Sequence, residues 1–493
     1  MDKLHAQAMD LKQWCQLDEQ IYIAEMDERY KQYAGLHYSE QMLERLAEMR
    51  TISAETFVNF FSRPRELFLS SLENIADSST KKLELKLYNL RNEKIISSRY
   101  RIASAPVNWS TWRQFNSIEK DPKKRKHVFD EFISKTRYIS PVIKERFDQM
   151  DGIYRKYSNN KLTPLCGYLE SEKISYSHLA DFVKSMGRQA RKPFQEALHS
   201  ISKKVLGRKA EYYDDFYFFR NRVYADLEKE FAGVNPTEQV RRTLATMQFD
   251  LSSIHIDTEQ RKNKYPSPIC FFVQVPNDIR VLYKSESPYF DLQGCYHEMG
   301  HAVHASSISV EAEYWNRYSF SMGIAEIFSI FLERLTKNRK YLSSFGIKNN
   351  HILEEVQARN NFMDLFFITF YTANSLMKAE FWHKKLSIEK ASDVYARLIK
   401  EYTGFEMPGE YWMLHHILPD AIMYAPSYLI AAVRAVELEH HLRDRFGEKW
   451  WTQLETGKYI REIIQPGGAI NLSRFSRFDS SLFMNELTDI GSI

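Results

Sequence analysis

Apolar side chains recur at helical spacing through most of this chain, and few helix-breaking residues interrupt them. The 493 residues include 17 glycines and 15 prolines, so long irregular connections are few. In residues 39–50, Ser39 can cap a helix, and apolar side chains follow on one stripe: Met42, Leu43, Leu46 and Met49. Similar periodicity recurs in 55–75, 128–150, 176–205 and 209–230. The sequence therefore predicts a mainly α-helical fold.

One stretch departs from the helical pattern. Residues 269–275 are rich in β-formers, 276–278 are typical of a turn, and 279–284 form a second β-type run. This order predicts a hairpin, and so one small sheet in a helical chain. A break at 233–236 suggests a boundary. We therefore expect an N-terminal helical lobe over residues 1–235 and a second region, with the chemistry, over 236–493.

The charge and the cysteine content of the chain bear on its binding partners and its cellular compartment. The formal net charge is +4, which gives no case for binding nucleic acid or a membrane surface. No apolar run approaches the length that spans a bilayer, and the N-terminus lacks the apolar core of a signal peptide. The four cysteines are widely spaced, which favours a reducing compartment. We expect a cytoplasmic protein, and the sequence leaves its oligomeric state open.

Residues 297–301 read His-Glu-Met-Gly-His, a pattern with a specific chemical meaning. On a helix, His297 and His301 share a face, so both imidazoles can bind one metal ion. Zinc suits this arrangement, since imidazole ligands leave positions open for water and substrate. Glu298 lies beside the first ligand and is the candidate general base. Helix propensity disfavours Gly300, so we expect close packing there or space for substrate.

A catalytic zinc site needs a third protein ligand, and Glu326 is the candidate. It follows His301 after 24 intervening residues, on a predicted helix that is otherwise mostly apolar. A carboxylate in such surroundings is costly unless it is paired or bound to a metal. Glu333 lies on the same helix face, seven residues on. It is either an exposed carboxylate near the helix end or a side chain that orients a ligand histidine.

These motifs resemble the thimet oligopeptidase and oligopeptidase F family of zinc peptidases. That family carries HExGHxxH followed by E-x-x-S-x-x-x-E, which matches residues 297–304 and 326–333. The resemblance is specific over about 290–335. It implies one zinc per chain, short peptide substrates, and two helical lobes flanking a deep channel that excludes folded proteins. We add His304 and Asp291 as side chains expected to contact the ligands rather than the metal.

The resemblance also implies a second half of the site, in which a histidine and several tyrosines contact the substrate carbonyl. Tyr424 and Tyr428 match two of those tyrosines. A neutral hydroxyl there can donate to a developing oxyanion. The histidine is assigned to His416, with His415 as a competitor, because Pro419 occupies the position that strict spacing would give it. Core packing is the alternative for both tyrosines.

The expected reaction is hydrolysis of internal peptide bonds. Zinc would activate a water, Glu298 would take its proton and pass it to the leaving amine, and a tyrosine would support the oxyanion. The 269–284 hairpin could pair with the backbone of an extended substrate, or it could be purely structural. Two other functions stay open: a carboxypeptidase or dipeptidyl carboxypeptidase similar to angiotensin-converting enzyme, and a zinc-containing peptide-binding protein without activity.

Overall fold

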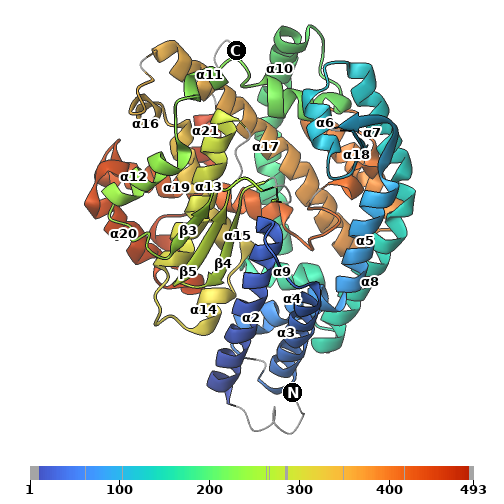
Figure 1. The fold of residues 1–493 in the computed structure, drawn as a ribbon, viewed down its shortest axis with the longest axis vertical. Coiled ribbons are helices and arrows are strands. Elements are labelled where there is room, and N and C mark those ends of the chain that lie inside the picture. The colour runs from blue at the N-terminus through green and yellow to red at the C-terminus, as the bar shows by residue number, and fades with distance from the viewer. Residues whose placement is uncertain are drawn as a thin grey trace. The chain divides into compact units, whose positions relative to one another are not determined.

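The computed structural model describes residues 10–61, 63–102, 104–261, 264–265, 267–283, 287–347, 349–415 and 417–487 (Figure 1). Helices dominate these residues, which confirms the predicted fold class. Contacts divide the chain into two compact units, each assembled from three segments. The first unit comprises the chain up to Ser79, Glu228–Asn349 and Ile430–Asp479. The second comprises Thr80–Leu227, Asn350–Leu429 and the chain from Ser480 onward.

The first unit contains three strands, most of α19, and the helices that surround them. Its elements are α2 (Leu11–Ala34), α3 (Glu40–Phe60), α4 (Arg65–Ser79), α11 (Glu228–Phe231), α12 (Pro236–Thr246), β3 (Ile254–Asp257), β4 (Ile269–Gln274), β5 (Asp278–Leu282), α13 (Pro288–Ser307), α14 (Tyr314–Tyr318), α15 (Met322–Glu333), η4 (Arg334–Lys337), α16 (Arg339–Ser343), α19 (Ala425–Phe446), η6 (Trp450–Thr452), α20 (Leu454–Ile464), η7 (Gly467–Ala469) and η8 (Leu472–Arg474).

The second unit is built mainly from helices and carries one two-stranded sheet. Its elements are α5 (Lys81–Lys94), β1 (Ile96–Ile102), β2 (Ala105–Asn108), α6 (Trp112–Ile118), α7 (Pro122–Lys135), η1 (Thr136–Tyr138), α8 (Ser140–Tyr157), α9 (Pro164–Ser171), α10 (Tyr176–Leu206), η2 (Tyr212–Asp214), η3 (Phe216–Arg222), α17 (Asn350–Lys384), α18 (Ile388–Thr403), η5 (Gly409–Leu414) and α21 (Ser481–Glu486). The antiparallel strands β1 and β2 have no counterpart in the sequence analysis.

The predicted hairpin is present as β4 and β5, which pair antiparallel. A third strand, β3, joins it in parallel with β5, so the strand order is β3-β5-β4 and β4 lies at an edge (Figure 1). One face of the sheet packs against α2, where Phe271, Val273 and Leu282 form a buried cluster with Ala34. The side chains of β4 alternate, so Phe272 points the other way, with its ring 6.4 Å from the ring of His301 in α13.

The capping prediction for α3 is confirmed, but its apolar stripe is only partly buried. The helix begins after Ser39, whose hydroxyl accepts a hydrogen bond from the Met42 amide at 3.2 Å. Leu46 is 5% exposed, whereas Met42 and Met49 are 46% and 37% exposed. The stripe therefore identified the helix correctly and its buried face incorrectly.

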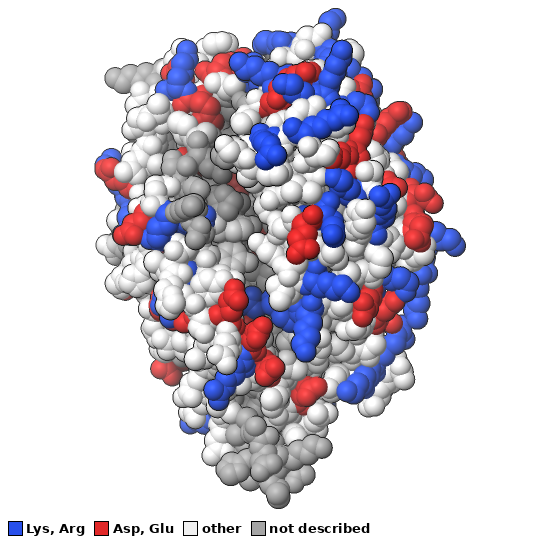
Figure 2. All heavy atoms as spheres, turned by 45° about the vertical axis from the view of Figure 1, so that its right-hand side comes forward, with Lys and Arg blue, Asp and Glu red and all other residues white. Residues whose placement is uncertain are grey.

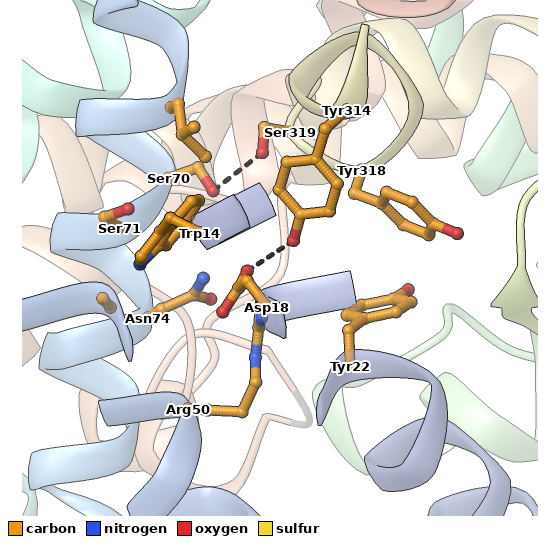
Figure 3. A pocket seen from close by; sticks show the side chains of 12 residues that line it. Trp14, Asp18, Tyr22, Arg50, Ser70, Ser71, Asn74, Tyr314, Tyr318 and Ser319 are labelled. Atoms are coloured by element: carbon orange, nitrogen blue, oxygen red, sulfur yellow. Dashed lines mark hydrogen bonds and ion pairs between the residues drawn. The ribbon is translucent and has the colours of Figure 1, made fainter. Parts of the chain in front are cut away.

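A polar pocket of about 80 Å³ lies among α2, α3, α4 and α14 (Figure 3). On one side of it, the buried Asp18 carboxylate accepts a hydrogen bond from Arg50 at 2.5 Å and another from the Tyr314 hydroxyl (Figure 3). The Ser70 hydroxyl donates to the Ser319 hydroxyl at 3.1 Å. These contacts tie the N-terminal helices to α14. Since α14 immediately precedes α15, they also fix the start of the helix that carries Glu326.

Acidic and basic side chains are interspersed over the face drawn in Figure 2, as the small net charge of +4 leads one to expect. Among the described residues, no helix combines the length and apolar character needed to cross a bilayer.

Candidate metal centre

Two helices of the first unit bring the three expected metal ligands together. Both histidines project from α13, one turn apart, and Glu326 projects from α15. The Glu326 Oε2 atom lies 3.4 Å from His297 Nε2 and 3.5 Å from His301 Nε2. One ligand atom from each residue therefore falls within 4.8 Å of the others, which makes the group a candidate metal site.

Gly300 explains how the two helices approach closely enough. A Cβ atom at this position would lie 2.3 Å from the Phe328 carbonyl oxygen and 2.5 Å from the Ser329 Cα atom, both in α15. Such distances are far below ordinary contact, so only glycine permits this packing. Of the two reasons expected for Gly300, the structure supports close packing. Without it, Glu326 would be held farther from the histidines.

Further hydrogen bonds hold the side chains of all three candidate ligands in place. His297 Nδ1 lies 3.0 Å from Glu333 Oε2, so Glu333 sets the orientation of this ring. The His301 ring hydrogen-bonds to the Ala325 backbone. The Ser329 hydroxyl donates to Glu326 Oε2 at 2.9 Å, which holds the buried carboxylate in place.

The donor set fits zinc. Two imidazole nitrogens and one carboxylate oxygen are common ligands of catalytic zinc, which keeps a further position open. At bond lengths of about 2.0–2.1 Å, tetrahedral ligands lie about 3.3 Å apart. The observed separations of 3.4 and 3.5 Å between Glu326 Oε2 and the two Nε2 atoms are close to that value.

The pKa values of the two histidines are shifted in opposite directions. Burial lowers the pKa of His301 to about 4, an effect that Glu326 opposes, so this ring is neutral and able to coordinate a cation at neutral pH. Burial also acts to lower the pKa of His297, but hydrogen bonds with Glu326 and Glu333 together raise it well above its usual value. Without a bound cation, both ring nitrogens of His297 are therefore protonated, and each faces a carboxylate. A bound cation would displace the proton on Nε2, the nitrogen that faces Glu326.

Glu298 has the electrostatic character of a proton acceptor. Burial raises the pKa of its carboxyl to about 7, and the negative charges of Glu326 and Glu333 act in the same direction. His297 and a backbone hydrogen bond from Cys270 in β4 lower it. A cation bound by the three ligands would lower it further. A carboxylate with a pKa near or below neutral suits general-base chemistry.

The two other residues expected to contact the ligands lie elsewhere in α13. Asp291 Oδ1 accepts a hydrogen bond from the Ser287 amide at 3.1 Å, at the start of the helix. His304 is fully buried, with its ring 5.1 Å from Phe320 and 4.8 Å from Phe328. Neither ring nitrogen of His304 finds a hydrogen-bond partner among the described residues. Burial lowers its pKa to about 3, so it acts as a neutral packing ring.

The remaining candidates belong to the second unit. The Tyr424 and Tyr428 rings are half-buried and lie 5.0 Å apart, and Tyr371 lies 5.0 Å from Tyr428. His416 lies outside the described residues. His415 is buried, and its Nδ1 atom accepts a hydrogen bond from the Ile417 amide at 3.1 Å, so this nitrogen is already used within its own segment.

Two contacts at this centre were not predicted from the sequence. The Ser329–Glu326 bond could have been inferred, because residues three apart on a helix are neighbours. The Cys270 backbone contact to Glu298 has no local signal, since it depends on how β4 packs against α13.

Comparison with known proteins identifies the fold. No protein-family model and no curated protein sequence matches the chain. Among solved structures, Pz peptidase A with an inhibitor aligns at a TM-score of 0.60 and 16% identity, over 97% of this chain and 86% of that one. A protein of Bacillus anthracis str. Ames assigned as an oligoendopeptidase F aligns at 0.56 and 16% identity, over 97% and 84%. The chain therefore has the fold of these oligopeptidase structures, which confirms at the level of fold the resemblance seen in residues 290–335.

Proposed function

We propose that this protein is a zinc-dependent peptidase that cleaves internal bonds of short, unfolded peptides. The observation that carries the proposal is the convergence of His297, His301 and Glu326, with Glu298 next to the first ligand on the same helix. A metal site without catalytic use would have no chemical need for a buried carboxylate with a raised pKa at that position.

When bound, zinc supplies Lewis acidity, which polarises the scissile carbonyl and acidifies a coordinated water. The chain's own residues do the rest. Glu333 and Ser329 hold His297 and Glu326 in their binding geometry. Glu298 accepts the proton of the attacking water and delivers it to the departing amine nitrogen.

The proposal gives the edge strand β4 a role in binding. Its outer edge carries no strand partner among the described residues, and its Cys270 amide reaches the Glu298 carboxylate. A substrate backbone paired there would lie along the zinc helix, and main-chain pairing tolerates many side chains. Tyr424, Tyr428 and His416 remain the proposed donors to the oxyanion, on the resemblance of their segment to the oligopeptidase family.

The direct test is digestion of a mixture of short peptides, followed by mass spectrometry, with and without a metal chelator. We expect internal cleavage that the chelator abolishes and added zinc restores. Stepwise loss from peptide C-termini would instead support the carboxypeptidase alternative. Zinc binding with no cleavage of any peptide would leave a peptide-binding protein.

The matched variant is Glu298→Gln, which keeps the size and burial of the side chain and removes its basicity. We expect zinc content equal to wild type and peptide turnover lower by about 10²- to 10⁴-fold, the range for loss of a general base. Wild-type turnover in this variant would remove Glu298 from the mechanism.

A further inference from the structure

Residues 415–424 connect η5 to α19, and we call them the connecting segment. The segment carries Tyr424 and both candidate histidines, and its described residues form neither helix nor strand. Yet its side chains are largely buried: Leu418 is 1%, Met423 3% and Ile422 7% exposed. An irregular backbone inside a protein needs hydrogen-bond partners that no ladder supplies.

Side chains of the second unit supply such partners by donating to the last carbonyl of η5 and to carbonyls within the segment. Trp109 Nε1 and Arg113 Nη2 donate to the Leu414 carbonyl at 3.2 and 2.8 Å. Lys378 Nζ donates to the Leu418 carbonyl at 3.0 Å, and Trp382 Nε1 donates to the Ile422 carbonyl at 3.0 Å. The donors come from α6, α17 and the residues between β2 and α6, so several elements converge on one short segment.

Asp420, in the middle of the segment, is held in two ways. Arg91 Nη1 lies 3.1 and 3.0 Å from its two carboxylate oxygens, and an Arg146 guanidinium nitrogen donates to its backbone carbonyl. Both arginines are buried, at 4% and 3% exposure. A buried guanidinium is costly to desolvate, so these contacts strongly disfavour other placements of Asp420.

Lys378 is the unusual member of this set. It is 1% exposed, and its ammonium nitrogen lies 4.1 Å from the centre of the Phe147 ring and 5.5 Å from those of Phe381 and Trp382. No described carboxylate lies within ion-pairing distance of it. Burial lowers the pKa of this amine well below its usual value. Among the described residues, its one hydrogen bond is to the Leu418 carbonyl, directly before Pro419.

We propose that Lys378 and Trp382 are positioning residues for the peptidase reaction, which they serve by fixing the connecting segment in one conformation. They lie one turn apart on α17 and hold the carbonyls on either side of residues 419–421. Those two peptide planes set where α19 begins, and so the direction of Tyr424 and Tyr428. This inference rests on the proposed function, since the segment matters to the reaction only if its tyrosines donate to substrate.

The test uses the full-length, zinc-loaded protein and two variants that remove one donor each. Lys378→Met keeps the length and apolar stem, and Trp382→Phe keeps an aromatic ring. The matched control is Trp412→Phe, which also removes a buried indole donor at 3.0 Å, but from the Ser392 hydroxyl rather than from the connecting segment. Thermal unfolding and zinc content of all three identify any variant that fails to fold.

Two measurements are made on each protein. Hydrogen exchange followed by mass spectrometry should show amides of 415–424 exchanging about tenfold faster in both test variants, with α13 unchanged, because local opening costs less. On a short peptide, kcat should fall about 10- to 100-fold with KM nearly constant, the scale for a misplaced catalytic group. The Trp412→Phe control should match wild type in both measurements.

The outcomes separate this inference from the proposed function. If exchange in the segment is unchanged, or if it rises while kcat stays at the level of the control, the inference is wrong although the peptidase proposal stands. If Trp382→Phe alone folds, its exchange and kcat decide the matter. A zinc-loaded wild type that cleaves no peptide would overturn the proposed function, and this inference with it.

Discussion

At the scale of single residues, the candidate centre depends on carboxylates placed in three different environments. Glu326 is buried and shares its Oε2 atom with two imidazoles and a hydroxyl. The pKa of Glu333 is lowered to about 2: burial opposes this shift, but Lys337 and His297 outweigh it. At Glu298 burial outweighs the opposing effect of His297, and the pKa of the carboxyl rises to about 7. One carboxylate is thus suited to binding a metal, one to orienting a ligand, and one to accepting a proton.

The pH dependence of turnover follows from Glu298. Its carboxyl must lose a proton before it can act as a base, so kcat/KM should rise with pH on the acid side. Without metal its pKa is about 7, and a bound cation lowers it, so the half-maximal point should lie below 7. A profile of kcat/KM from about pH 5 to 9, with zinc content checked at each pH, measures this. Activity that falls as the pH rises toward 7 would contradict the assignment.

Glu333 should control zinc affinity rather than the chemical step. Glu333→Ala removes the acceptor for His297 Nδ1, and loss of such a partner commonly weakens metal affinity about 10- to 100-fold. Competition with a zinc chelator measures the affinity. Glu448→Ala is the control, because that carboxylate is 56% exposed and forms ion pairs with Lys340 and Arg443. Equal zinc affinity in the two variants would show that the Glu333 contact has no role in binding.

Sequence spacing was sufficient to find the three residues that converge at the candidate centre. One helical turn separates His297 from His301, and the motif that contains Glu326 follows them at the distance seen in the family that they resemble. The same reasoning was insufficient for His304, because its position beside Phe320 depends on a loop that folds back onto α13. Nothing local to its motif distinguishes a packing histidine from one that contacts a ligand.

At the scale of elements, the approach of α13 to α15 creates the centre, and Gly300 makes that approach possible. Gly300→Ala should force the helices apart, since its Cβ atom would overlap the Phe328 carbonyl. Overpacking of this kind costs about 1–3 kcal/mol. Chemical unfolding measures that cost, and zinc affinity should fall with it because Glu326 moves away.

Gly152→Ala is the control for that prediction. This glycine also lies inside a helix, α8, but a Cβ atom there would have nothing within 4 Å. Its replacement should leave stability unchanged or raise it, because alanine favours the helix. Equal effects at Gly152 and Gly300 would show that the helices tolerate a side chain at their contact.

Local sequence patterns predicted where strands and helices form better than they predicted which other elements these pack against. The hairpin of β4 and β5 was identified because turn residues separate two β-rich runs. The strand β3 is four residues long and is stabilised by pairing with β5, far along the chain, so its own sequence gave little signal. In α3, helical spacing identified the stripe of Met42 and Met49, but which side of a helix is buried depends on the neighbouring helices.

At the scale of the whole molecule, the chain does not divide at a single point. The expected boundary near 235 lies close to one crossover, at Leu227–Glu228, but each compact unit draws on three separate segments. Residues 11–79 fall in the same compact unit as β3, β4, β5 and α13, whereas Thr80–Leu227 fall in the other unit. This assembly of each unit from separate segments depends on contacts between residues far apart in the sequence, which helical periodicity does not reveal.

The proposed peptidase function implies selectivity between unfolded and folded substrates. An extended backbone can pair with the edge of β4, whereas a folded protein has already paired its own backbone. Short unfolded peptides should be cleaved, and a stable globular protein that contains the same sequences should resist. Time courses on both, followed by mass spectrometry, test this. Comparable rates on the two substrates would contradict it.

The central claim is that His297, His301 and Glu326 bind one zinc ion, and X-ray absorption at the zinc edge tests it most directly. The spectrum of the zinc-loaded protein should show one zinc per chain with two imidazoles and carboxylate oxygen at about 2.0–2.2 Å. In Glu326→Gln, bound zinc should fall sharply. A shell of sulfur atoms at about 2.3 Å, or a spectrum that this substitution leaves unchanged, would contradict the account.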